Sequence, residues 1–189
     1  MKRLFAYSCA ATALAVTVSA CSTPAPAPAP APVLATSPVT VPAQLEVPPG
    51  HKLSLETSAT GVQVYVCAAA KSDPSTSEWR LKTPEAELFN VAGNKVGKHY
   101  FGPTWEAADH SQVVGEVKAR QDDPRGAAIP WLLLSAKSNS GKGIFNAVRF
   151  IQRLATEAGK APADGCSAAT VGQEVRVPYK AIYRFFQAA

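Results

Sequence analysis

The sequence has few charged and aromatic residues, and it lacks the common catalytic motifs. Charged residues make up 17% of its 189 residues and aromatic residues 8%. No Gly-x-Ser-x-Gly motif is present, which argues against a serine hydrolase built on that nucleophile turn. Residues 136–143 are similar to part of a phosphate-binding loop, but Ala136 replaces its first Gly and Gly143 replaces the hydroxyl residue that holds magnesium. The motif is therefore incomplete and does not indicate a nucleotide-binding site.

The net charge is too small to indicate a nucleic-acid partner. The chain has 19 basic and 14 acidic residues, a balance of +5. Lys2 and Arg3 belong to a predicted signal peptide, and without them 17 basic residues face 14 acidic ones, a balance of +3. Such a balance predicts only a weak attraction to anionic lipid headgroups.

The hydrophobic run at 4–18 is too short to cross a bilayer comfortably, and with Lys2 and Arg3 before it we predict a signal peptide at 1–20. The run ends in Val18-Ser19-Ala20-Cys21, which is typical of a bacterial lipobox. There, small residues fit the peptidase and the Cys21 thiol becomes a thioether to diacylglycerol. The alternative is an ordinary secretory signal in which Cys21 is accidental.

The signal peptide and the lipobox-like segment predict a cell-envelope lipoprotein, held at the membrane by an N-terminal lipid that includes palmitate. Ser22, rather than Asp, follows Cys21 and favours the outer membrane, facing the periplasm. Residues 21–46 are rich in Pro and Ala, which predicts a disordered, extended tether with a reach of roughly 80 Å. Binding of the cell wall by this segment is an alternative to a pure spacer.

Four cysteines leave one candidate pair. Cys9 is removed with the signal peptide and Cys21 takes the lipid, so Cys67 and Cys166 remain. In an oxidising periplasm two such residues most often form a disulfide. Closing a loop of this size stabilises the fold by up to about 4–5 kcal/mol in the chain-entropy model. The alternative is two unpaired, buried thiols.

Residues 47–189 form one predicted domain that is mainly β. Alternating or apolar patterns predict strands at 52–57, 62–67, 79–81, 86–91, 112–119, 129–135 and 179–185. The run 129–135 is continuously apolar, as expected for a strand buried on both faces. The segment 144–156 fits both helix and strand, and its Val, Phe and Ile content favours a strand. Short strands between Gly, Pro and polar turns predict a β-sandwich or a barrel-like domain.

The stretch 98–117 gathers the residues best suited to binding or catalysis: His99, Tyr100, Trp105, Glu106, Asp109 and His110. The imidazole groups of the two histidines and the carboxylates of Glu106 and Asp109 suit a divalent metal or acid–base catalysis, but the spacing matches no established metal motif. The simplest alternative is architecture, in which Trp105 enters the core while Glu106 and Asp109 bind turn amides or an arginine such as Arg153.

A ligand cleft is the third interpretation of the same stretch. Aromatic rings stack on sugars and apolar molecules, and carboxylates anchor their polar groups. The aromatic candidates are Trp105, Trp131, Tyr100 and Tyr179, with Glu106 and Asp109 as anchors.

Several ordered motifs resemble the domain of unknown function 3455 family. They are Gly61-Val62-Gln63-Val64-Tyr65-Val66-Cys67, His99-Tyr100, Gly102-Pro103-Thr104-Trp105-Glu106, Ile129-Pro130-Trp131-Leu132-Leu133, Ile151-Gln152-Arg153 with Thr156, and Val177-Pro178-Tyr179-Lys180-Ala181-Ile182-Tyr183. The resemblance covers nearly all of 41–186 and implies one exported domain without a known activity. This chain has Asp109-His110-Ser111 where the family pattern reads Asp-Gly-Ser, so His110 is expected to take an unusual backbone angle.

These observations together predict an envelope lipoprotein whose domain binds a ligand or has a structural role. The alternative is a metal-dependent or acid–base enzyme that uses His99, Glu106 and Asp109, and we expect binding rather than catalysis. No cofactor is predicted. The expected partners are the membrane, through the lipid, and a small molecule or an envelope component.

Overall fold

The computed structural model describes residues 39–189, so the predicted signal peptide, Cys21 and most of the tether lie outside the described residues. The fold is mainly β, as predicted. Its elements are η1 (Ala43–Leu45), β1 (His51–Ala69), β2 (Ser77–Phe89), β3 (Lys95–Tyr100), β4 (Thr104–Ala107), β5 (Gln112–Gln121), β6 (Trp131–Ser140), β7 (Val148–Ala158), η2 (Ala168–Thr170) and β8 (Glu174–Ala188). Among the described residues, no helix has the length and apolar character needed to cross a membrane.

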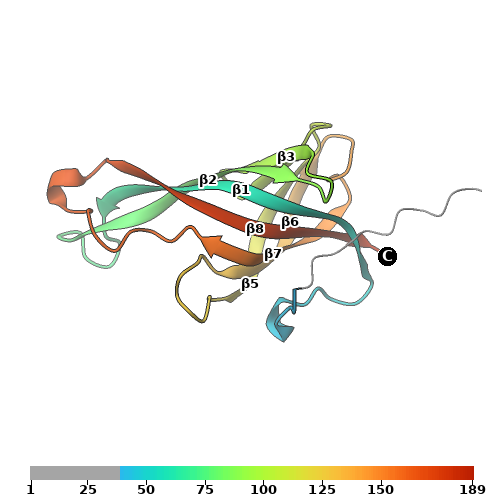
Figure 1. Ribbon diagram of the computed structural model, residues 1–189, viewed down its shortest axis with the longest axis horizontal. Helices are drawn as coiled ribbons and strands as arrows, with labels where there is room; N and C mark the ends of the chain where they lie inside the picture. Colours follow the sequence, from blue (N-terminus) through green and yellow to red (C-terminus); the bar gives the residue numbers. More distant parts are fainter. Residues whose placement is uncertain (1–38) are drawn as a thin grey trace, which may run out of the picture. The chain divides into compact units, whose positions relative to one another are not determined.

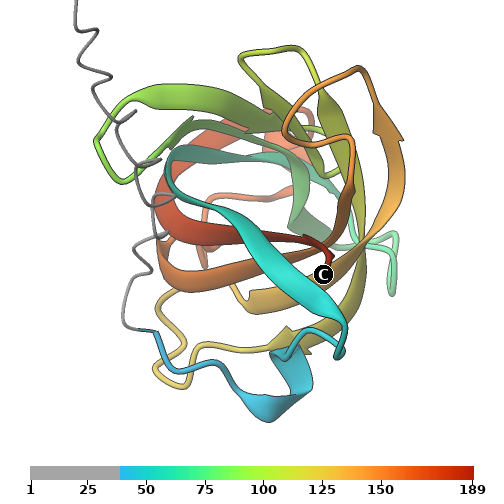
Figure 2. The ribbon, with the colours of Figure 1, turned by 90° about the vertical axis from the view of Figure 1, so that its right-hand side faces the viewer.

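The eight strands form one closed antiparallel barrel in chain order (Figures 1 and 2). Each strand pairs with its neighbour in the sequence, and β8 returns to pair with β1 from Ala188 to Glu174. Closure leaves no unpaired sheet edge along this seam, so the backbone groups of both long strands are satisfied within the barrel. Of the two architectures that the sequence predicted, the barrel is the one formed.

The first two strands are longer than the sequence pattern indicates. The predicted strands 52–57 and 62–67 belong to β1, and those at 79–81 and 86–91 merge largely into β2. The polar and small residues between them suggest a break, yet they pair on both sides; Gly61, for example, lies opposite Ala86 and Tyr179. A Cβ at Gly61 would lie 2.1 Å from the Glu85 carbonyl oxygen, so only glycine allows this close pairing.

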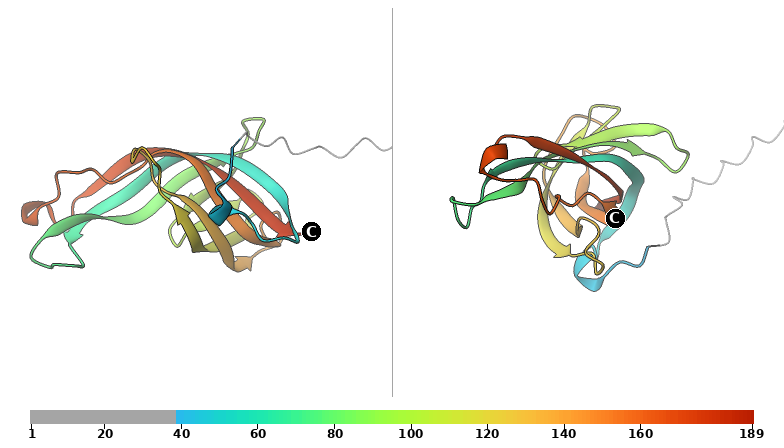
Figure 3. Two further views of the ribbon diagram at one scale, coloured as in Figure 1. Left: turned by 90° about the horizontal axis from the view of Figure 1, so that it is seen from below. Right: turned by 60° about the vertical axis from the view of Figure 1, so that its left-hand side comes forward.

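Strands β1, β2 and β8 continue beyond the other strands as an extended arm (Figure 3, left). The β1–β2 loop and the η2 segment meet at its end, where Cys67 and Cys166 form the predicted disulfide with Cα atoms 5.3 Å apart. The Trp79 indole also donates a hydrogen bond to the Asp164 carbonyl. The disulfide therefore holds the β7–β8 connection against the β1–β2 hairpin.

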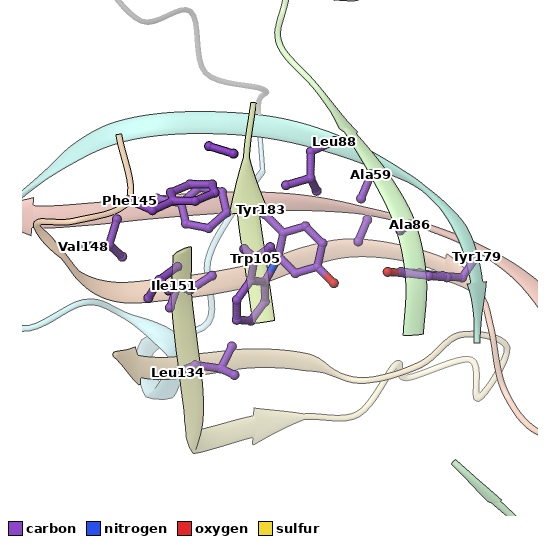
Figure 4. Close-up of a cluster of buried hydrophobic side chains, with 14 of the residues drawn as sticks. Ala59, Ala86, Leu88, Trp105, Leu134, Phe145, Val148, Ile151, Tyr179 and Tyr183 are labelled. Atoms are coloured by element: carbon purple, nitrogen blue, oxygen red, sulfur yellow. The ribbon is translucent and has the colours of Figure 1, made fainter. Parts of the chain in front are cut away.

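The barrel interior is filled mainly by aromatic and aliphatic side chains (Figure 4). The last strand buries one face here, and Tyr179, Ala181, Tyr183 and Phe185 on that face are each at most 3% exposed. The ambiguous segment 144–156 forms strand β7 from Val148, as favoured from its composition.

A second cluster lies on the outside of the barrel, under the N-terminal segment. Leu45 of η1 is fully buried against Leu133 and Leu154, and its carbonyl accepts a hydrogen bond from Gln152. This cover explains why the apolar run near Leu133 is buried on both faces. It also means that the packed domain begins before residue 47, because residues expected in the tether supply one side of this cluster.

Candidate functional site

A cavity of about 320 Å³ opens into the barrel and is bordered by residues of all eight strands. We refer to it as the barrel cavity. It is lined by Gln63, Leu81, Lys82, Pro84, His99, Phe101, Gly102, Pro103, Trp105, Val117, Leu132, Leu134, Arg153 and Tyr183. Most of this lining is apolar, and it contains neither Asp nor Glu.

His99 and Trp105 form the wall of the barrel cavity on β3 and β4. They are directly opposite each other in the β3–β4 register, and their rings stack with centroids 4.4 Å apart and an interplanar angle of 10°. Tyr183 packs edge-on against both rings. Gly115 makes room for the indole, since a Cβ there would lie 2.9 Å from a Trp105 ring carbon.

The His99 imidazole is held neutral by burial. The residue is only 3% exposed, and this burial lowers the pKa of His99 to about 3. Nδ1 lies 2.9 Å from the Thr104 carbonyl oxygen, which can only accept a hydrogen bond. Nδ1 therefore carries the proton, and Nε2 is the unprotonated nitrogen.

Two residues that line the cavity have a buried nitrogen donor without a hydrogen-bond partner among the described residues, namely Gln63 (Nε2) and Trp105 (Nε1). The buried hydroxyl of Tyr183, and that of Tyr179 deeper in the barrel, also make no hydrogen bond of normal geometry. Burial raises the pKa of both tyrosines, so they stay neutral. Unpaired buried donors are uncommon in folded proteins and costly, which makes this wall unusual.

Arg153 brings a positive charge to the same cavity. It lies opposite Tyr183 in the β7–β8 register, so both side chains share the inner face. Its Nε donates a hydrogen bond to the Pro130 carbonyl oxygen at 3.0 Å. Within the described part of the chain, Arg153 forms no salt bridge with a carboxylate.

The rim of the barrel cavity is apolar and open to solvent. Leu81, Phe101 and Val117 are 54%, 70% and 50% exposed, and they account for half of the six large hydrophobic side chains exposed in residues 39–189. Lys82 stands beside them and pairs with Glu174. A mostly apolar lining with a small number of polar groups is the usual composition of a small-molecule site.

The structure separates the residues that the sequence grouped as one candidate site. His99 and Trp105 face inward, whereas Glu106 pairs with Lys98 and accepts a hydrogen bond from Tyr100. Lys98 and Glu106 lie opposite each other one position along from His99 and Trp105, so the pleat directs them to the other side of the sheet. The Tyr100 hydrogen bond is the main reason that the pKa of Glu106 is lowered.

Asp109 stabilises the loop between β4 and β5 by accepting hydrogen bonds, as the architectural alternative predicted. Its carboxylate accepts hydrogen bonds from the Ser111 amide and hydroxyl and from the Ile144 amide. These bonds, led by that of the Ser111 hydroxyl, lower the pKa of Asp109. Arg153 is a partner of neither Asp109 nor Glu106. His110 has φ +65°, which confirms the unusual backbone angle expected at this position.

Trp131 and Tyr179 do not complete the predicted aromatic cleft. Trp131 packs in the outer cluster beside η1, while Tyr179 is buried inside the barrel and Tyr100 lies on its outer face. No group of three or more potential metal ligands occurs within residues 39–189. His99, Glu106 and Asp109 are therefore not assembled as the enzyme alternative requires.

The sequence interpretation missed Gln63, Arg153 and Tyr183 as site residues. The sequence contained a signal for two of them. Gln63 lies on the same strand face as Tyr65 and Cys67, and Tyr183 lies on the same strand face as Ala181 and Phe185. A polar side chain within a buried face is a candidate for a functional position. Alternation could not identify Arg153, because neighbouring positions of β7 are buried on both sides.

The model of the family described as "Protein of unknown function (DUF3455)" matches residues 48–187. The chain therefore belongs to this family, as the sequence motifs indicated. No curated protein and no solved structure matches the chain.

Proposed function

We propose that this DUF3455 protein is a lipid-anchored protein of the cell envelope that binds one small, largely apolar molecule in its barrel cavity. The observation that carries the proposal is the barrel cavity itself, with exposed Phe101 at its rim and the unpaired donors of Gln63 and Trp105 on its wall. Eight-stranded barrels are wide enough to hold one small ligand. The volume of about 320 Å³ falls at the lower end of the range for small-molecule sites.

A binding role is supported over acid–base catalysis by the positions of the candidate groups. His99 is neutral and a weak base with a pKa of about 3, and its ring is enclosed by Trp105 and Tyr183. A general base works best with a pKa near the operating pH. Glu106, the nearest acid in the predicted site, lies on the other side of the sheet.

The envelope location is supported by the sequence before the barrel. The lipobox-like segment ending at Cys21 and the Pro- and Ala-rich stretch after it would leave the barrel outside the inner membrane. The Cys67–Cys166 disulfide is consistent with an oxidising compartment. We propose the outer membrane, facing the periplasm, because Ser22 follows Cys21.

The test uses residues 22–189 and the neutral apolar probe N-phenyl-1-naphthylamine. We expect its fluorescence to rise and shift to the blue on titration, with saturation at one equivalent of probe. Val117→Trp should fill the cavity mouth and lower the probe affinity at least tenfold, because the larger ring occupies the entrance.

Val171→Trp is the matched control. Val171 is 55% exposed, close to the 50% of Val117, but it lies in the η2 region and does not line the barrel cavity. Its replacement should leave probe binding unchanged. Absence of saturable binding to the wild type, or equal losses in the two variants, would sink the proposal.

A further inference from the structure

We propose that the barrel cavity selects a monocarboxylate with an apolar body, whose carboxylate group is bound inside by Arg153, Trp105 Nε1 and Gln63 Nε2. The inference rests on the proposed binding function and specifies the class of ligand. It begins from the polar atoms of the cavity, which are mainly donors.

The first step is the charge of Arg153. Its guanidinium has five N–H donors, and one of them is used by the Pro130 carbonyl. The lining of the cavity contains no Asp or Glu that could balance it. A charge that is partly withdrawn from water without a counter-ion is unfavourable, so an anion that enters the cavity gains a partner that the protein does not supply.

The second step is the pair of unpaired donors. Gln63 and Trp105 line the cavity, and the Nε2 of Gln63 and the Nε1 of Trp105 are buried without an acceptor among the described residues. A carboxylate is an acceptor with two oxygens and about four lone pairs. One such group can accept from both nitrogens and from the guanidinium, which would satisfy the donors that the fold leaves open.

The third step is the direction of the ligand. The rim residues Leu81, Phe101 and Val117 are apolar and exposed, so the apolar body of the ligand belongs near the mouth and the carboxylate inside. Lys82 at the mouth is paired with Glu174 and does not offer a free charge there.

The fourth step separates a carboxylate from a phosphate. Arg153 is the one cationic lining residue without a carboxylate partner in the described part of the chain. A single positive charge balances a monoanion, whereas a phosphate monoester near neutral pH carries close to two negative charges. The mostly apolar lining also disfavours a dianion, because it cannot replace the lost hydration.

The test is displacement of N-phenyl-1-naphthylamine from residues 22–189 at pH 7.5 by decanoate and by 1-decanol, which share the same chain. We expect decanoate to bind about 10–100 times more tightly than decanol, the range for hydrogen bonds to a charged group. Arg153→Gln should abolish this preference, because it weakens decanoate binding by more than it changes the binding of decanol or the probe.

Arg149→Gln is the control for the loss of charge, since Arg149 lies on the same strand with an exposed side chain. It should keep the preference for decanoate. Circular dichroism reports whether each variant folds, and if Arg153→Gln does not, Gln63→Met carries the test by removing one donor at similar size. It should lower decanoate affinity severalfold more than it changes decanol affinity.

The outcomes distinguish the two proposals. Equal or weaker binding of decanoate, with the probe and decanol still bound, overturns the carboxylate inference and leaves the binding function standing. A preference for decanoate that survives both Arg153→Gln and Gln63→Met overturns the assignment of the residues. If the wild type binds neither the probe nor decanol, both proposals fail.

Discussion

The His99 imidazole is a neutral ring inside the barrel, where it stacks on Trp105. Because its pKa falls from 6.5 to about 3 on folding, the unfolded chain binds a proton that the folded chain does not. Stability is therefore fully present above pH 6.5 and is lost as the pH falls toward 3.

We expect this group to lower the free energy of unfolding by about 2 kcal/mol between pH 7 and pH 5. His99→Gln should make the curve of stability against pH shallower by one proton in this window, although it lowers stability at pH 7 through lost stacking. Urea unfolding at a series of pH values measures the slope.

Tyr183→Phe is the control for this slope. It keeps the ring that packs edge-on against His99 and removes only the hydroxyl, so the slope of the wild type should be retained. A slope in His99→Gln equal to that of the wild type would show that His99 is not the group that takes up the proton.

Asp109 joins two loops at the same end of strands β4, β5, β6 and β7. It lies between β4 and β5, and it accepts a hydrogen bond from Ile144, between β6 and β7. Gly143 permits this approach, since a Cβ there would lie 2.1 Å from an Asp109 carboxylate oxygen. The contact ties the two hairpins together next to Phe145, which is buried in the core.

Asp109→Ala should lower the melting temperature at pH 7 by roughly 5 °C, because the Ser111 and Ile144 amides lose their acceptor. The pKa of Asp109 is lowered in the fold, so its contribution is present above the unfolded value of 3.8 and is lost as the pH falls through the folded value. Thermal unfolding monitored at pH 7 and pH 3 should therefore show a larger difference from the wild type at pH 7 than at pH 3.

The corresponding surface control is Asp122→Ala. Asp122 is 72% exposed and pairs only with Arg120 in the described contacts, so its loss should change the melting temperature by about 1 °C or less. Equal shifts in the two variants would contradict a specific role for Asp109.

Three features hold together parts of the folded domain that are distant in the sequence. The β1–β8 pairing closes the barrel, the disulfide joins residues 99 positions apart, and η1 covers the outer cluster. The disulfide is expected to contribute up to about 4–5 kcal/mol by restricting the unfolded chain. The proposed lipid at Cys21 would add a further constraint, that of the membrane.

Labelled palmitate should enter the wild-type protein in a Gram-negative host and should be absent from Cys21→Ala. The reason is that Cys21 is the acceptor in the proposed lipobox and that only a thiol at this position can receive diacylglycerol. The labelled form should also sediment with outer-membrane vesicles. Equal labelling of both proteins would overturn the anchoring proposal.

The β class, the family and the disulfide pair could all be predicted from the amino-acid sequence. Alternation indicated the strand at 179–185, and the choice of Cys67 and Cys166 followed from the predicted roles of the other two cysteines. These features depend on short sequence patterns and on cysteine chemistry, and neither requires knowledge of how the strands pair. The strand over Val148–Ala158 was also favoured correctly from its residue types.

Which candidate residues meet could not be predicted from the sequence, because it depends on how distant strands pair. Closure of the barrel brings Gln63, Trp105, Arg153 and Tyr183 from four different strands to one cavity. The two-residue period of the pleat places Glu106 on the opposite side of the wall from His99, although they are close in the sequence. Which residues of different strands meet depends on the register between distant segments, and a local pattern does not contain that information.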